Sequence, residues 1–145
     1  MSVLLGQGEF KYRVVEDWAK LPENWSFMDV AGVAVSSKDE IFVFNRGKHP
    51  MIVFDIDGNY LRSWGENLFS RPHGIHIGPD DYIYCTDDGD HTVKKISPDG
   101  KLIFQIGIPG KPSEFMSNLP FHRCTHTALC PDNNIFVSDG YGNAC

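Results

Sequence analysis

Three residues have side chains that could do chemistry, and each lies after an apolar run or beside a proline or glycine. Arg46 follows the run Ile41–Phe44 after one asparagine, His73 lies between a proline and a glycine, and Tyr141 lies between two glycines. A guanidinium binds a carboxylate by two hydrogen bonds, an imidazole ligates zinc, and a phenol transfers a proton. The alternatives are a solvated arginine, a structural histidine and a tyrosine that caps the core, and residue types alone leave them open.

A zinc site needs more ligands than the sequence supplies around His73. The positions that align with His73 in the other repeats are Ala31 and Thr125, which do not bind zinc. His76 has the opposite strand parity. Two further histidines, His122 and His126, lie near the third inner strand.

Calcium is a second possible metal, because the chain is rich in aspartate. Three of these residues, Asp87, Asp88 and Asp90, follow one apolar run. In turns such residues more often accept hydrogen bonds from their own backbone, so the cluster does not by itself indicate a calcium site.

The chain repeats itself with a period of about forty residues. Ser36–Val43 aligns with Gly78–Cys85 at an offset of 42 residues, and the same offset continues downstream through a pair of Asp-Gly turns. A third copy begins at Thr125, where Cys130–Val137 repeats the second copy at an offset of 52 residues. The difference predicts an inserted loop.

Each copy consists of short apolar runs separated by Pro, Asp, Asn and Gly, which predicts strands. The first copy contains four predicted strands: Val30–Val35, Ile41–Asn45, Met51–Ile56 and Tyr60–Trp64. Four strands in about forty residues are typical of one β-propeller blade. The alternating segment Phe10–Val15 is expected to supply the outer strand that closes the ring.

Composition excludes several classes of partner. The 145-residue chain has a formal net charge of −6 and no cluster of basic residues, which argues against nucleic acid and anionic membranes. Met1–Gly8 lacks the features of a secretory signal, so we expect a cytoplasmic protein. The cysteines form no C-x-x-C motif and are expected to be free thiols: Cys85, Cys124, Cys130 and Cys145.

The motifs around the three candidate residues resemble a known family in order and spacing. They are Gly32–Val35 leading to Val43–Gly47, Asn67–Phe69 leading to Pro72–Gly74, and Val137–Tyr141. These stretches are similar to the NHL-repeat group and, within it, to the peptidyl-α-hydroxyglycine α-amidating lyases. The similarity spans most of residues 30–143.

The resemblance implies a role for each candidate. Arg46 would orient the substrate, His73 would be one of three zinc ligands, and Tyr141 would act in catalysis. The backbone carbonyls of Val33 and Ile75 would bind a structural calcium. The family reaction cleaves an α-hydroxyglycine terminus into an amide and glyoxylate.

The resemblance also implies what lies elsewhere. In the family, the other two zinc histidines and an aspartate ligand to calcium belong to later blades. Secreted animal members carry a disulfide at the positions that match His122 and Gly142, so this chain looks like an intracellular or microbial relative.

We therefore predict an all-β fold, a β-propeller of NHL-type four-stranded blades that has six blades when complete. This chain holds about two and a half blades. The predicted divisions are an N-terminal segment (1–29) with the ring-closing strand, blade 1 (30–71), blade 2 (72–121) with an inserted loop (108–121), and partial blade 3 (122–145). Missing C-terminal blades or a second copy would complete the ring, and the chain alone is expected to be inactive.

The predicted function is that of a metal-dependent lyase acting on a peptide or small molecule with a carboxylate. One alternative is a non-catalytic NHL propeller that binds a protein or a small ligand. A further alternative is a lactonase-type hydrolase, which would hold calcium through channel carboxylates and asparagines.

Overall fold

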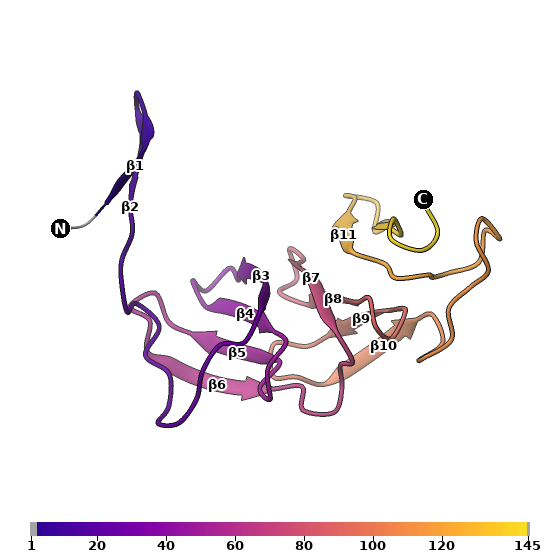
Figure 1. Cartoon of the computed structure of the whole chain (residues 1–145), viewed down its shortest axis with the longest axis horizontal. Coiled ribbons are helices and arrows are strands. Elements are labelled where there is room, and N and C mark those ends of the chain that lie inside the picture. Colours follow the sequence, from indigo (N-terminus) through magenta and orange to yellow (C-terminus); the bar gives the residue numbers. More distant parts are fainter. Residues whose placement is uncertain (1–2, 145) are drawn as a thin grey trace.

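The protein consists of strands joined by turns and loops (Figure 1). This computed structural model describes residues 3–144, and that range contains twelve strands and no helix. The prediction of an all-β fold is confirmed. Within the described range there is accordingly no helix that could cross a membrane.

Two four-stranded antiparallel sheets form complete blades, and a third sheet has two strands. Blade 1 contains β3 (Val30–Val35), β4 (Ile41–Asn45), β5 (Met51–Phe54) and β6 (Tyr60–Trp64). Blade 2 contains β7 (Pro72–Ile77), β8 (Ile83–Asp87), β9 (Thr92–Ile96) and β10 (Leu102–Ile106). The third sheet contains β11 (His126–Leu129) and β12 (Ile135–Ser138).

The structure differs from the expected strands in two places. β5 ends at Phe54 and not at residue 56, because the Asp55 carboxylate accepts hydrogen bonds from the backbone amides of Asp57 and Asn59 and starts the turn. Near the N-terminus, β2 (Phe10–Arg13) pairs with β1 (Leu4–Gln7) as a separate hairpin. A ring-closing role for this segment stays a prediction.

The repeat is visible in the backbone of the turns between the first two strands of each sheet. Asp39, Asp81 and Asn133 have φ angles of 57°, 59° and 66°, in the left-handed region that Asp and Asn tolerate. In each turn the amide of this residue donates to the carbonyl three positions earlier, from Asp39 to Ser36 for example. Equivalent sequence positions therefore adopt equivalent conformations.

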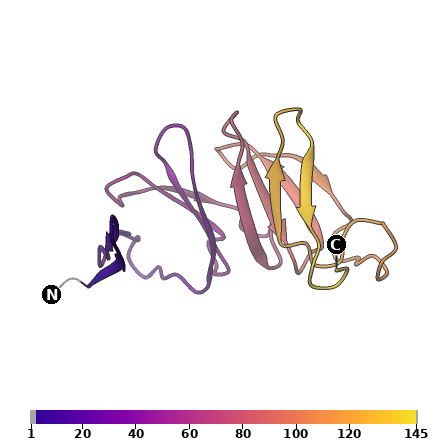
Figure 2. The same cartoon turned by 90° about the horizontal axis from the view of Figure 1, so that it is seen from above.

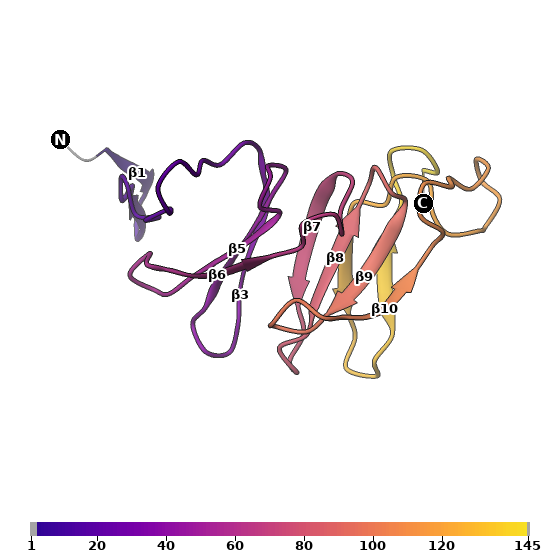
Figure 3. The same ribbon diagram turned by 90° about the horizontal axis from the view of Figure 1, so that it is seen from below.

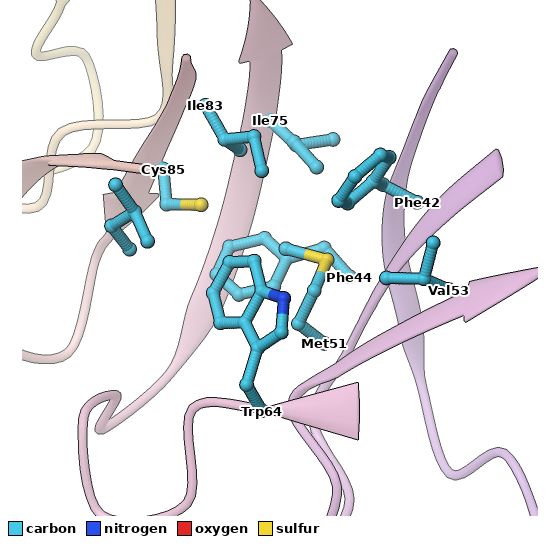
Figure 4. Packing of buried hydrophobic residues seen from close by; sticks show 9 residues of the cluster. Phe42, Phe44, Met51, Val53, Trp64, Ile75, Ile83 and Cys85 are labelled. Carbon is cyan, nitrogen blue, oxygen red and sulfur yellow. The ribbon is translucent and has the colours of Figure 1, made fainter. Parts of the chain in front are cut away.

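The first two blades share one hydrophobic core (Figure 4). Side chains from β4, β5 and β6 interlock with side chains from β7, β8 and β9. The core residues are Phe42, Phe44, Met51, Val53, Trp64, Ile75, Ile83, Cys85 and Ile96. Burial of this apolar surface fixes the position of blade 2 against blade 1.

The N-terminal segment covers the opposite face of blade 1. Val43, Ile52 and Phe54 are buried there beneath partly buried side chains of residues 18–27, including Trp18 and Trp25. The Trp18 indole also donates a hydrogen bond to the carbonyl of Ile56. The central strands β4 and β5 of blade 1 are thus buried on both faces within this chain.

The inner strands of the three sheets lie next to one another (Figures 2 and 3). β3 contacts β7, and β7 contacts β11. A groove of about 310 Å³ runs along these strands. The end of β4, the start of β7 and the loop after β12 lie at the same end of these sheets. Arg46, His73 and Tyr141 belong to these three segments and are therefore close to one another.

Candidate functional site

His73 is held at the start of β7 by the neighbouring sheet. Its Nδ1 lies 2.8 Å from the carbonyl oxygen of Thr125. A carbonyl only accepts, so Nδ1 carries the proton and Nε2 is left with a lone pair in the neutral ring. The same Thr125 carbonyl accepts a hydrogen bond from Thr86 Oγ1 at 2.8 Å, and Thr86 Oγ1 accepts from the amide of Gly74 at 2.7 Å.

Tyr141 lies directly against His73. The phenol oxygen is 3.2 Å from His73 Nε2, and the ring centroids are 5.3 Å apart in an edge-on arrangement. Because Nε2 is the acceptor, the tyrosine hydroxyl donates. The phenol is 61% exposed, so it is open to a substrate approaching from the same end of the blades.

Arg46 is hydrogen-bonded to the backbone of Pro72, the residue that precedes His73. Its Nε donates to the carbonyl of Pro72 at 2.9 Å, its backbone amide donates to the carbonyl of Asp29 at 2.9 Å, and Nη1 lies 3.9 Å from the Asp29 carboxylate. Within residues 3–144, Nη2 has no hydrogen bond or ion pair. The guanidinium is therefore positioned and still has donors available for an anion.

A buried carboxylate supports the tyrosine from its other side. Asp88 is fully buried and bridges two arginines, with Arg71 Nη1 at 2.5 Å and Arg123 Nη2 at 2.8 Å. Pairing of this kind is what a buried carboxylate requires. Arg123 in turn lies over the Tyr141 ring, 5.1 Å from its centroid, where the cation is attracted to the π face.

Val33 and Ile75 both line the groove between the inner strands, from β3 and β7 respectively. No aspartate or glutamate of residues 3–144 lines it with them. Their role as carbonyl ligands stays a prediction.

The positions that match the family disulfide lie side by side. The amide of Gly142 donates to the carbonyl of His122 at 3.0 Å, and a Cβ built on Gly142 would fall within 2.1 Å of the His122 ring. The described cysteines are free, and Cys145 lies outside the described residues. Burial raises the pKa of the Cys85 thiol and raises that of Cys124 to about 12.

Four of the five other histidines form two ring pairs. His91 and His122 lie 5.7 Å apart, and burial, with a smaller contribution from His122, lowers the pKa of His91. His76 and His126 lie 6.4 Å apart, and burial, with smaller contributions from His76 and His73, lowers the pKa of His126. No group of three or more His, Cys, Asp or Glu side chains in the described part of the chain could hold a metal ion.

Comparison with known proteins shows what the chain is similar to. The chain is 30% identical over 140 residues to human NHL repeat-containing protein 3, which covers 90% of this chain and 40% of the relative. It is 36% identical over 90 residues to peptidyl-α-hydroxyglycine α-amidating lyase 1 of Drosophila melanogaster, which covers 60% of this chain and 16% of the relative. No protein-family model matches.

The chain is thus similar to NHL-repeat proteins, and its four-stranded sheets are consistent with partial β-propeller blades. It spans less than half the length of these curated relatives. A solved structure from Bacteroides thetaiotaomicron, of unknown function, shares the fold with a TM-score of 0.59 at 18% identity, covering 77% of this chain and 30% of that one.

Sequence reasoning singled out three residues that the structure places close together, but not the residues that support them. The structure brings Arg46, His73 and Tyr141 together at one end of the blades. Thr125 was rejected as a metal ligand, yet its backbone carbonyl orients His73. Arg123 gave no signal, because its stacking on Tyr141 joins two loops that only folding brings together.

Proposed function

We propose that this chain carries part of the active site of a metal-dependent lyase of the amidating type, which cleaves an α-hydroxyglycine-like substrate into an amide and glyoxylate. The observation that carries the proposal is the 3.2 Å contact between His73 Nε2 and the Tyr141 hydroxyl. It joins two candidate groups from different repeats, next to the anchored Arg46. Amidating lyases among the relatives support it.

The orientation of His73 fits a metal ligand. Histidines that bind metal usually donate their second ring N–H to a carbonyl or carboxylate, as Nδ1 does here to Thr125. His73 would hold zinc through Nε2 in place of its hydrogen bond from the Tyr141 hydroxyl, and the other ligands would come from outside residues 3–144. When bound, zinc supplies polarisation of the substrate hydroxyl.

The other residues have separate tasks. The reaction breaks the bond between the amide nitrogen and the α-carbon, removes the proton of the α-hydroxyl and returns a proton to the leaving nitrogen. As a phenolate, Tyr141 would take the hydroxyl proton as general base and could return it to the leaving nitrogen. Arg46 binds the substrate carboxylate through its unpaired Nη2 and so orients the bond that breaks.

The test uses the full-length protein, with release of glyoxylate from a peptidyl-α-hydroxyglycine as the assay. Tyr141→Phe is expected to lower kcat by about 10²- to 10⁴-fold with zinc content unchanged. His73→Ala should lose zinc and turnover together, whereas Arg46→Lys should mainly raise KM. His49→Ala, on a ring stacked against Trp25 in blade 1, is the control. Full turnover in the Tyr141→Phe and His73→Ala proteins would overturn the proposal.

A second candidate is a non-catalytic propeller that binds a ligand at the same surface. It is favoured by the absence, within residues 3–144, of three side chains able to hold one metal ion. It predicts a full-length protein without bound zinc or lyase turnover, in which Arg46→Ala still weakens binding of a carboxylate ligand. Zinc analysis of the purified full-length protein separates the two candidates.

A further inference from the structure

Two histidines away from the Arg46–His73–Tyr141 site face each other across the boundary between blade 2 and the third sheet. His76 belongs to β7 and His126 to β11. Their ring centroids are 6.4 Å apart and their planes are tilted by 59°. Neither ring makes a hydrogen bond or an ion pair with any other residue of 3–144, so both rings have lone pairs available.

An irregularity in β7 brings His76 to this side. Strict alternation would point His73 and His76 to opposite faces, but the pairing of β7 with β8 shifts register between Pro72 and Ile75. Both histidines consequently contact the third sheet, His73 through the carbonyl of Thr125 and His76 through the ring of His126.

Gly74 makes room for the second ring. A Cβ built at Gly74 would lie 2.7 Å from His126 Nδ1 and 2.3 Å from the carbonyl oxygen of Thr125. Any larger residue would push the His126 ring away from β7. The glycine therefore permits His126 to pack against the strand that carries His76.

The spacing of the two rings suits one shared ion. Imidazole nitrogens bind first-row metals at about 2.0–2.1 Å, which puts the centres of two rings on one ion roughly 5–6 Å apart. The observed 6.4 Å is within a small side-chain rotation of that range. The groove lined by His126 has no aspartate or glutamate among its described lining residues, so no carboxylate there competes with the imidazole nitrogens for an ion beside His126.

We propose that His76 and His126 form a transition-metal site, for Zn²⁺, Co²⁺ or Ni²⁺, that joins blade 2 to the third sheet. His73 is not a ligand of this site, because its Nδ1 donates to the Thr125 carbonyl and its Nε2 faces Tyr141 in the candidate active site. With two protein ligands, water fills the other positions, and the ion acts as a link between sheets. The site does not depend on the proposed lyase function.

The test titrates the 145-residue protein with Co²⁺ alone, followed by its visible absorption, and then displaces Co²⁺ with Zn²⁺. One equivalent should bind without the ultraviolet charge-transfer band of a thiolate ligand, which rules out Cys130. Zn²⁺ should raise the unfolding temperature, since binding to the folded state stabilises it. His76→Gln and His126→Gln should each weaken Co²⁺ binding by more than ~10-fold. A loss of that size separates a residue that binds the ion directly from one that only supports a ligand.

One variant serves as a control. His49→Ala, whose ring stacks on Trp25 away from both sites, should bind Co²⁺ as the unchanged protein does. Circular dichroism of His76→Gln and His126→Gln checks that both still fold, and a second pair, His76→Asn and His126→Asn, replaces either glutamine variant that does not. The proposal is wrong if the folded variants keep full affinity, if the unchanged protein binds no Co²⁺, or if His49→Ala weakens binding as much as the His76 and His126 variants do.

Discussion

Tyr141 is exposed to solvent but is not free to move. One contact is the His73 ring at its hydroxyl, and the other is the Arg123 guanidinium over its face. Arg123 is itself held by the buried Asp88. A charge pair inside the protein thus positions a group at its surface, which explains how a loop tyrosine can have a defined orientation.

The pH dependence of stability should reflect His91. Burial lowers the pKa of His91 in the folded protein below its ordinary value of 6.5, so between those two pKa values the unfolded chain binds more protons. Stability is therefore full above about pH 6.5 and falls as the pH drops through the folded-state pKa. Denaturant unfolding at a series of pH values measures this.

His91→Asn is the matched variant for that measurement. His91 has a φ of 59°, and asparagine tolerates this left-handed conformation. Between pH 7.5 and about 5, the variant should lose less stability than the unchanged protein does. The loss that the variant still shows comes from other histidines whose pKa is lowered, such as His126. An identical loss in both proteins would contradict the assignment.

The free thiols should differ in reactivity. Cys85 and Cys124 are fully buried and burial raises their pKa values, whereas Cys130 is partly exposed. Because the thiolate is the reactive form, iodoacetamide should label Cys130 in the native protein and leave the other two unlabelled. Peptide mass mapping reads this out, with urea-unfolded protein as the control in which all are labelled. Native labelling of Cys85 would refute the buried position.

The three central site residues could be found from sequence because each has a distinctive type beside a proline or glycine. Their partners could not. Asp29 and Arg123 are ordinary charged residues whose importance comes from contacts with Arg46 and Tyr141, and those contacts exist only once distant segments are packed together.

At the scale of single elements, the turns repeat more faithfully than the strands. Gly58 and Gly100, which follow aspartates in equivalent turns, have φ angles of 76° and 93°. Each packs against a tryptophan, Trp18 in one turn and Trp64 in the other. The turn glycines therefore serve both backbone conformation and packing between layers.

Gly100→Ala should destabilise the protein by about 1–3 kcal/mol, because it adds backbone strain and a Cβ at 2.6 Å from the Trp64 ring. Gly110→Ala is the control: its φ is 68°, but nothing lies within 4 Å of the added Cβ. The two variants share the strain and differ in the clash. Equal losses in denaturant unfolding would show that the Trp64 contact does not matter.

Strand positions were predicted well where turn chemistry marks both ends, as for Ile41–Asn45 and Tyr60–Trp64. Side-chain direction was predicted less well in β7, because a register shift cannot be seen in a pattern that assumes strict alternation. The loop 108–121 was recognised from the repeat offset alone, and the structure contains turns there with a single isolated bridge between Ile108 and Lys111.

At the scale of the molecule, the hydrophobic core lies between blades and not within them. Phe44→Ala should cost about 3–5 kcal/mol, since the ring is fully buried and contacts Phe69 edge-on. Although Phe44 lies in blade 1, the loss should appear equally in blade 2, as faster labelling of Cys85. Denaturant unfolding followed by tryptophan fluorescence and by Cys85 labelling should give one shared midpoint, and separate midpoints would contradict a common core.

The shared core has a consequence for what counts as a unit of this protein. The sequence repeat divides between Arg71 and Pro72, yet a chain cut there would expose Phe42, Phe44 and Trp64 on one piece and Ile75 and Ile83 on the other. A single blade is therefore the unit that is repeated in the sequence, whereas two blades with their shared core form the unit that folds stably. Amide hydrogen exchange should consequently protect β4 and β8 to a similar degree, because their slowest amides would exchange through the same opening event.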